Sequence, residues 1–178
     1  MPTSTRRQAA NSALTPTIFT IATDLGPLEI ELRGDVVYRL SFAPGKRPRK
    51  SGAGLSAQQQ KIVALLQQYA AGEPVDLTEI EIDLSGYPPF ATRVYQQCRK
   101  IRPGTTLSYG ELAAKAGSPN AARAVGSAMA KNRITLVIPC HRVVAAGGKL
   151  GGYSAPEGLP LKKRLLKLEQ EATKTTST

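Results

Sequence analysis

A cysteine followed directly by a histidine and an arginine is the part of this sequence best suited to chemistry. Cys140 is one of only two cysteines, and His141 is the only histidine. A thiolate becomes a strong nucleophile once a neighbouring base or cation lowers the pKa of the thiol. The apolar, β-branched run at 134–138 predicts a buried strand, which Pro139 ends. The sequence therefore places a potentially activated thiol at the end of a buried strand.

The adjacency of Cys140 and His141 does not establish catalysis by itself. A lone cysteine after an apolar run is usually a small buried hydrophobe. Neighbouring side chains on a strand point to opposite faces, so a hydrogen bond between these two needs a turn or a bridging water. The other cysteine, Cys98, shares a predicted helix face with Val94 and Ile101, and we interpret it as a packing residue.

Length and composition limit the class of protein. The 178 residues suit one domain, or two small ones with a common core. The net charge of +11 favours a polyanionic partner such as nucleic acid. Two cysteines without Cys-x-x-Cys spacing exclude a disulfide framework and a cysteine-rich zinc site, and we expect no metal and no cofactor. We expect no membrane partner, because no apolar run reaches spanning length.

The polar N-terminus lacks the apolar core of a signal peptide, and a free thiol suits a reducing compartment. These features predict a cytoplasmic protein, associated with the nucleoid, in a prokaryote, or a nuclear protein in a eukaryote.

The first part of the chain predicts a sheet with one helix. Residues 1–15 are expected to be a disordered basic tail, and residues 16–87 a first domain. Three strand-like runs indicate an antiparallel meander, at 17–22, 28–33 and 36–42. Ser56 begins a capping box, and apolar residues at helical spacing follow it. The alternation of Ile80, Ile82 and Leu84 predicts one more strand.

The second part, residues 88–170, is expected to be mostly helical. Ser108 can cap a short helix, residues 117–120 form a turn, and a second helix begins near Arg123. Two short helices of this kind in a basic protein are similar to a helix-turn-helix. The alternative is a helical hairpin unrelated to DNA, in which Arg123 is an ordinary surface charge.

Two further segments come after Cys140. The glycine-rich segment 147–152 suits a flexible loop that brings its backbone close to a ligand. A last helix begins near Pro160, with Glu169 expected at its C-terminal end and a frayed tail at 171–178. A carboxylate is poorly placed against the dipole at that end, so we expect Glu169 to have a tertiary partner such as His141.

The stretch from about Pro89 to Glu169 resembles the O6-alkylguanine-DNA alkyltransferases, also called methylated-DNA–protein-cysteine methyltransferases. The matching motifs are Ser108-Tyr109, Ala-Ala-Arg-Ala-Val-Gly at 121–126, Asn132, Pro-Cys-His-Arg-Val at 139–143, Gly-Tyr-Ser at 152–154 and Leu-Leu-Lys-Leu-Glu at 165–169. The resemblance implies an α+β fold. Its N-terminal part is a ribonuclease H-like antiparallel sheet with a helix, and its C-terminal part is a mostly helical domain with a winged-helix-like helix-turn-helix.

The resemblance also implies a function. The protein would act as a monomer, with cooperative assembly on DNA as an option, on double-stranded DNA that contains O6-alkylguanine or O4-alkylthymine. It would flip the damaged base and move the alkyl group irreversibly to Cys140, once per molecule. His141 would be the base acting through a water, Glu169 would orient it, Tyr109 would assist the leaving guanine, and Asn132 would brace the turn.

DNA contacts are implied for the helix-turn-helix and its surroundings, at Arg123, Ala122, Ala124, Ser108 and Arg142, with Arg123 replacing the flipped base in the stack. The substrate pocket would be formed by Met129, Val143, Gly152, Tyr153 and Ser154.

The sequence departs from the family at two places. Arg133 stands where the family often has proline, and residues 155–157 lengthen a loop. Three rival readings stay open: a lesion-binding protein of the same fold without transfer activity, a Cys-His hydrolase, and a DNA-binding regulator.

Overall fold

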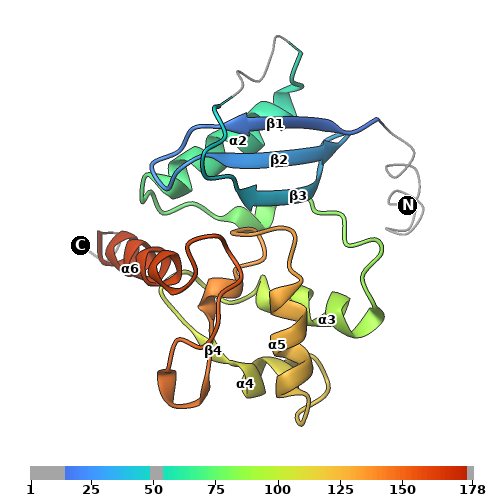
Figure 1. The fold of residues 1–178 in the computed structure, drawn as a ribbon, viewed down its shortest axis with the longest axis vertical. Coiled ribbons are helices and arrows are strands. Elements are labelled where there is room, and N and C mark those ends of the chain that lie inside the picture. The colour runs from blue at the N-terminus through green and yellow to red at the C-terminus, as the bar shows by residue number, and fades with distance from the viewer. Residues whose placement is uncertain (1–14, 49–53, 176–178) are drawn as a thin grey trace.

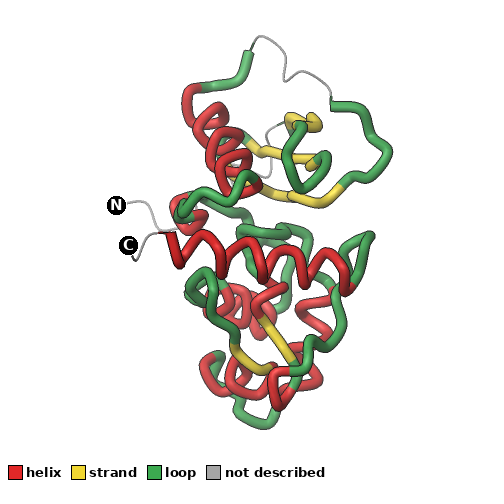
Figure 2. Tube along the Cα trace, turned by 90° about the vertical axis from the view of Figure 1, so that its left-hand side faces the viewer, coloured by secondary structure: helices red, strands yellow, loops and turns green. Residues whose placement is uncertain are grey.

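The computed structural model describes residues 15–48 and 54–175, which form two halves around a shared hydrophobic core. Figure 1 shows a sheet-containing half above a mostly helical half. Helix α6 (Leu159–Thr175) lies between the halves, as Figure 2 also shows. The fold is therefore mixed, with a small antiparallel sheet and, within the described residues, five α-helices. The tail predicted for residues 1–15 falls outside this description apart from Thr15.

The sheet follows the predicted alternation closely. It is antiparallel in the order β1-β2-β3, with bounds Thr17–Ile21, Leu28–Arg33 and Val36–Phe42. Leu28, Ile30 and Leu32 of β2 are fully buried and alternate with partly exposed residues. Helix α2 (Ala57–Ala70) covers one face, and its predicted capping box between Ser56 and Gln59 is present.

The further strand predicted around Ile82 is wrong. Ile82 forms only an isolated bridge with Val37, and the preceding residues Leu77–Glu79 form the 3-10 turn η1. Asp76 caps this turn and Ile80 ends it with extended backbone angles, so the alternation lies in the chain that leaves the turn, where only Ile82 is bridged to the sheet.

The C-terminal half contains three packed helices, α3 (Pro89–Cys98), α4 (Tyr109–Lys115) and α5 (Ala122–Ala130). Ser108 caps α4 through a capping box, as expected. Cys98 is fully buried, which agrees with its interpretation as a packing residue.

A pair of short parallel strands was not predicted. Strand β4 (Leu107–Ser108) pairs with β5 (Val143–Val144), and this pairing fixes the start of α4 beside the Cys140 segment.

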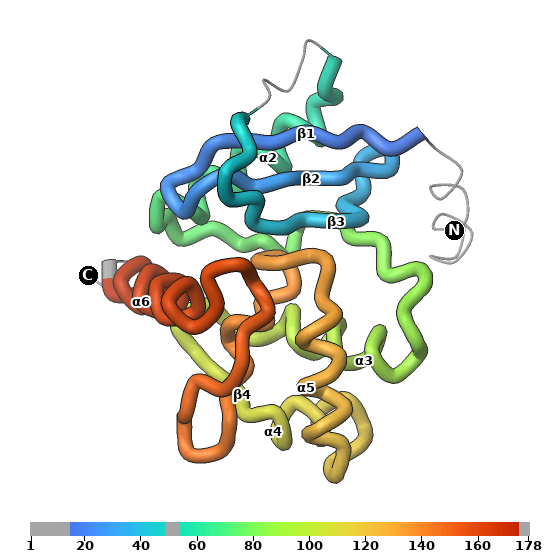
Figure 3. Tube along the Cα trace, in the orientation of Figure 1, coloured from blue at the N-terminus to red at the C-terminus, as the bar shows by residue number. Residues whose placement is uncertain are grey.

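The buried run at 134–138 is not a strand. It is buried as predicted, but Leu136 has a φ of +70° and the chain folds into consecutive turns. The amides of Val137, Ile138 and Cys140 donate to carbonyls two to four residues earlier. A bulky residue in the left-handed region is strained, and such strain persists only where the surroundings impose it. In Figure 3 this orange segment runs directly below β3, to which Ile134 is bridged through Leu40.

Helix α6 is longer than predicted. It continues to Thr175, so Glu169 lies within the helix and residues 171–175 are helical rather than frayed; the rest of the predicted tail lies outside the described residues. We expected a partner for Glu169 because we placed its carboxylate at the C-terminal end of the helix, and that placement was wrong. Within the described residues, no helix is long and apolar enough to cross a membrane.

Candidate active site

The Cys140 thiol lies in a cavity of about 260 Å³ between the helix-turn-helix and the glycine-rich loop. Pro139 precedes the 3-10 turn η2 (Cys140–Arg142), which carries the thiol. The cavity is lined by Tyr109, Gly126, Met129, Ala130, Cys140, Gly152, Tyr153 and Ser154. Its volume is slightly below the range of about 300–1,000 Å³ for small-ligand pockets, which suits a single planar group rather than an extended ligand.

Asn132 holds the segment that carries the thiol. Its side-chain amide donates to the Ile138 carbonyl at 2.9 Å and to Cys140 Sγ at 3.3 Å. Its Oδ1 accepts from the Ile134 amide at 2.9 Å. All three contacts fix the same carboxamide, so Asn132 braces the turn and also points a donor at the sulfur.

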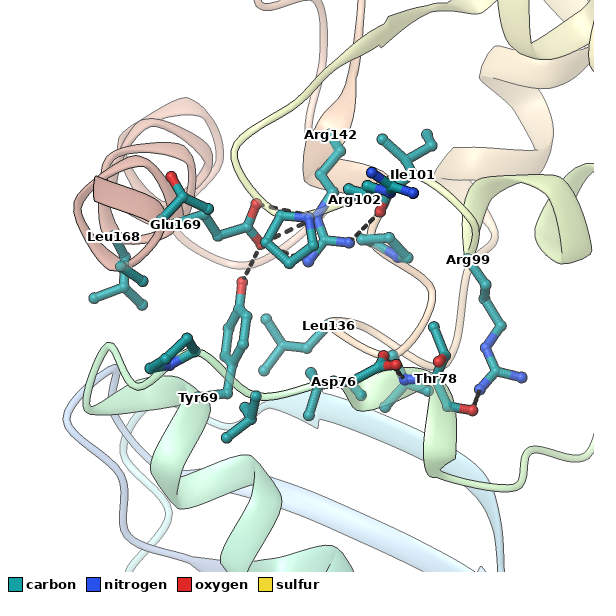
Figure 4. A pocket seen from close by; sticks show the side chains of 18 of the residues that line it. Tyr69, Asp76, Thr78, Arg99, Ile101, Arg102, Leu136, Arg142, Leu168 and Glu169 are labelled. Atoms are coloured by element: carbon teal, nitrogen blue, oxygen red, sulfur yellow. Dashed lines mark hydrogen bonds and ion pairs between the residues drawn. The ribbon is translucent and has the colours of Figure 1, made fainter. Parts of the chain in front are cut away.

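Behind the thiol, a buried network joins four side chains from three parts of the chain. His141 Nε2 lies 2.7 Å from Glu169 Oε1, and Arg142 contacts both carboxylate oxygens at 2.8 to 3.1 Å. The Tyr69 hydroxyl donates to Glu169 Oε1 at 2.6 Å and lies 3.3 Å from His141 Nε2. Figure 4 shows Tyr69 reaching Glu169 from the N-terminal half, with Arg142 on the other side. The expected partner of Glu169 is therefore present.

Burial and pairing set the charges in this network. Burial alone would raise the pKa of Glu169, but the hydrogen bonds and charges of His141 and Arg142 outweigh it and hold that pKa well below its usual range. Burial lowers the pKa of His141, and Glu169 only partly opposes this. The imidazole is therefore neutral near pH 7 and can accept a proton. Since Nε2 is engaged with Glu169, Nδ1 is the nitrogen left for that proton; it is buried and has no hydrogen-bond partner among the described residues.

The thiol is also kept neutral at rest. Burial raises the pKa of Cys140, while the Asn132 amide and the Lys162 charge act in the opposite direction. Lys162 is fully buried, and its Nζ donates to the carbonyls of Val143 at 2.6 Å, Leu150 at 2.5 Å and Gly152 at 3.2 Å. This ammonium thus ties the glycine-rich loop to the thiol segment and adds a positive charge near the sulfur.

A close backbone approach occurs in the glycine-rich loop, at Gly151. Its φ is +65°, and a Cβ there would meet Tyr109 at 3.1 Å. Only glycine fits this position without displacing the ring. Burial, followed by the neighbouring thiol, raises the pKa of Tyr109, which keeps its hydroxyl protonated as a donor.

Two predicted roles need correction. Arg142 is buried, and its guanidinium is occupied by Glu169 and the Ile101 carbonyl, so it does not offer a DNA contact. Val143 is fully buried and does not line the cavity; its carbonyl instead accepts from Lys162.

The predicted DNA-contacting residues gather on the helix-turn-helix. Arg123 and Ala124 are exposed near the start of α5, and Ala122 is partly exposed beside them. Ser108 is partly exposed and uses its hydroxyl to cap α4.

Comparisons with known proteins agree with the motifs. A family model described as "6-O-methylguanine DNA methyltransferase, DNA binding domain" matches residues 89–171. The methylated-DNA–protein-cysteine methyltransferase of Mycobacterium leprae (strain TN) is 39% identical over 159 residues, which cover 86% of this chain and 92% of that protein. The chain belongs to this family of methyltransferases.

Two other similar proteins extend the comparison. The crystal structure of Mycobacterium tuberculosis OGT in complex with DNA has a TM-score of 0.71 and 37% sequence identity, covering 86% of this chain and 92% of that one. A protein of Thermus thermophilus named "DNA base-flipping protein" is 37% identical over 142 residues, which cover 79% of this chain and 92% of the relative.

Sequence reasoning missed two residues that this methyltransferase site uses. Tyr69 was counted only as a core position of α2, although a buried tyrosine hydroxyl needs a partner. Lys162 was passed over within a basic run. It precedes Glu169 by seven residues, however, and this spacing puts both side chains on one helix face.

A second, larger groove of about 560 Å³ reaches the network at Tyr69, Arg142 and Glu169 but does not include Cys140 (Figure 4). Of the two, only the smaller cavity contains the Cys140 thiol.

Proposed function

We propose that this protein repairs alkylated DNA by moving the alkyl group from O6-alkylguanine to its own Cys140, once per molecule. The observation that carries the proposal is a buried thiol in a base-sized cavity, directly followed by a neutral histidine paired with a buried carboxylate. O4-alkylthymine, which offers the same oxygen-bound alkyl carbon, is a second substrate.

The reaction is one in-line displacement. Cys140 Sγ attacks the alkyl carbon, the bond from that carbon to the guanine O6 breaks, and its electron pair stays with the base. His141 takes the thiol proton at Nδ1 through a water, and Glu169 stabilises the imidazolium that forms. Tyr109 donates a hydrogen bond to the departing guanine, which finally carries the proton. The products are guanine and a thioether on Cys140, and no cofactor takes part.

DNA is bound through the helix-turn-helix, and the damaged base is turned out of the duplex into the cavity. The net charge of +11 and exposed Arg123 support this, as does the DNA complex of the similar Mycobacterium tuberculosis protein. Arg123 fills the gap in the base stack, next to Ala122, Ala124 and Ser108. Met129, Gly152, Tyr153 and Ser154 enclose the base. In this proposal the second helix of the pair, α5, enters the minor groove, and the degenerate pattern of donors and acceptors there suits a protein with weak sequence preference.

We also propose a monomer that can assemble cooperatively on DNA, located with the DNA in the bacterial cytoplasm, or in the nucleus of a eukaryote. The three-stranded sheet with α2 supports a ribonuclease H-like N-terminal domain at 16–87. The helix pair α4–α5 and the β4–β5 pair support a winged-helix-like domain at 88–170.

The rival functions fit the site less well. A lesion-binding protein without transfer has no use for Cys140. A hydrolase that formed an alkyl thioether would have to break its carbon–sulfur bond to regenerate the thiol, and a thiolate is a poor leaving group from an alkyl carbon. A regulator would need the helix pair but not the buried network at Glu169.

Intact mass measurement tests the function. The protein is incubated with a duplex that carries one O6-methylguanine, and we expect one added methyl per chain, located on Cys140 by peptide mapping. Cys140→Ser should bind DNA without transfer, because a hydroxyl is far less ionised than a thiol. Repeated turnover, or a methyl group on Cys98, would contradict the proposal.

A further inference from the structure

Arg133 connects the N-terminal half to the segment that holds the thiol. Its guanidinium donates to three carbonyls of the sheet-containing half, those of Tyr38 at 3.0 Å, Asp83 at 2.9 Å and Ser85 at 2.8 Å. It also lies against two aromatic rings, 4.1 Å from the centroid of Tyr38 and 4.2 Å from that of Tyr87. A planar guanidinium with five donors can lie flat against both rings and donate to the three carbonyls at once, which a compact ammonium does not do.

The backbone of Arg133 is fixed as firmly as its side chain. Its amide donates to the Tyr87 hydroxyl at 2.9 Å, and its carbonyl accepts from the Leu40 amide at 2.9 Å. Thr135 then donates to the Leu40 carbonyl at 2.9 Å. The chain on both sides of Arg133 is thus held against β3 and the loop after η1.

Asn132 lies directly before this fixed point, and it needs to be held in place. Its carboxamide reaches Cys140 Sγ at 3.3 Å, a contact that depends on the angle at which the segment leaves α5. This donor also lowers the pKa of the thiol against the effect of burial. A small rotation at residue 133 would move the amide away from the sulfur.

We propose that Arg133 is a positioning residue for the transfer reaction, through which the sheet-containing half sets the Asn132 amide against the Cys140 sulfur. Arg133 does not touch the cavity, and it acts only through Asn132. The proposal rests on the proposed function for its substrate, but its prediction about the thiol can be tested without that substrate.

The protein offers a matched control. Arg33 lies 3.3 Å from the same Tyr38 ring and pairs with Asp83 at 3.6 Å, so it contacts two of the residues that surround Arg133. Within the described part of the chain, Arg33 makes no hydrogen bond or ion pair with residues 132–135. Arg33→Met therefore removes a comparable cation–π contact without touching the thiol segment.

The experiment compares Arg133→Met, Arg133→Lys and Arg33→Met in the full chain. Two rates are measured across a pH series, the alkylation of Cys140 by iodoacetamide and the single-turnover reaction with free O6-benzylguanine. Peptide mapping distinguishes alkylation of Cys140 from alkylation of Cys98. The melting temperature of each variant is measured in parallel.

We expect both Arg133 variants to slow the O6-benzylguanine reaction about tenfold. The reason is that the Cys140 thiolate loses the Asn132 hydrogen bond, and loss of a hydrogen bond to a charged group has an effect of about this size or larger. The pH midpoint of iodoacetamide alkylation should rise, because the thiolate loses its donor. Arg33→Met should lower the melting temperature but leave both rates within about twofold. In an Asn132→Ala background, Arg133→Met should have no further effect on either rate.

The proposal is overturned if the Arg133 variants melt earlier but keep the rates and midpoint of Arg33→Met, since Arg133 would then be only structural. Arg133→Lys keeps a positive charge beside the rings, and it is compared with Arg33→Met if Arg133→Met does not fold. If the unchanged protein reacts with iodoacetamide but takes no methyl group from an O6-methylguanine duplex, the proposed function fails while the positioning role can still be judged from the thiol midpoint.

Discussion

Tyr69→Phe would test whether the N-terminal half takes part in the proton-accepting network. The substitution deletes the hydroxyl oxygen and keeps the ring, which extends from α2 into the core. That oxygen donates to Glu169 Oε1 at 2.6 Å and lies 3.3 Å from His141 Nε2. Glu169 keeps its contacts with His141 and Arg142 and with the Gly104 amide at 3.2 Å.

The magnitude follows from the charge of the acceptor. A hydrogen bond to a charged group contributes about 1.5–3 kcal/mol, so the free energy of unfolding should fall by about that amount. The carboxylate would then depend more on His141, which raises the pKa of the imidazole from its lowered position toward 6.5. If part of the lost stabilisation passes to His141, the acid side of the rate–pH profile moves to higher pH.

Urea unfolding at pH 7 and single-turnover rates with O6-benzylguanine between pH 4 and pH 8 measure the two effects. Tyr95→Phe is the control, because the Tyr95 hydroxyl donates to the uncharged Ala128 carbonyl at 2.7 Å in the same core. It should cost about 1 kcal/mol and leave the pH profile unchanged. If Tyr69→Phe costs no more than Tyr95→Phe and shifts no midpoint, Tyr69 is only a packing residue.

Other substitutions test the DNA surface and the loop. Arg123→Ala should slow repair of duplex DNA much more than reaction with the free base, because only the duplex requires unstacking; equal slowing would place Arg123 in the fold or the pocket. Binding to undamaged duplex, followed by fluorescence anisotropy, should weaken with a log–log salt slope of several units. Gly151→Ala should lower both stability and rate, since its Cβ would meet Tyr109 at 3.1 Å, whereas Gly148→Ala, with a φ of +74° and no atom within 4 Å, should affect stability alone.

Periodicity and capping predicted the parts of the fold that depend on local sequence. Strands β2 and β3 have the predicted bounds, and Ser56 and Ser108 cap the expected helices. The structure of each of these elements depends on residues close to it in the sequence, so a single sequence was enough to predict them.

The errors occur where distant contacts decide the local structure. The run at 134–138 has strand composition, but its hydrogen bonds to Leu40 on β3 and the left-handed Leu136 make it a turn. Arg142 was assigned to DNA because it is basic and follows the thiol. Its burial depends on Glu169, 27 residues later, which no local pattern reveals.

The pKa shifts lead to a last prediction, about the pH dependence of the reaction. Burial raises the pKa of Cys140 above its ordinary value of 9.0 and lowers that of His141 below 6.5, so both groups are neutral between these values. The rate with O6-benzylguanine should therefore be flat from about pH 6.5 to pH 9, fall only on the acid side and change on the alkaline side only above pH 9.

Stability should change outside the same window. His141 and Glu169 have lowered folded pKa values, so the unfolded chain binds more protons in acid, and stability falls below pH 6.5 and further below 4.5. The raised pKa of Cys140 has the opposite sign, because the unfolded thiol ionises first and stability falls above pH 9. A thiolate–imidazolium pair at rest would instead show a titration inside the flat region. An ultraviolet thiolate signal that appears between pH 6.5 and pH 9 would refute the neutral pair, and with it the need for His141 to remove the thiol proton during the transfer.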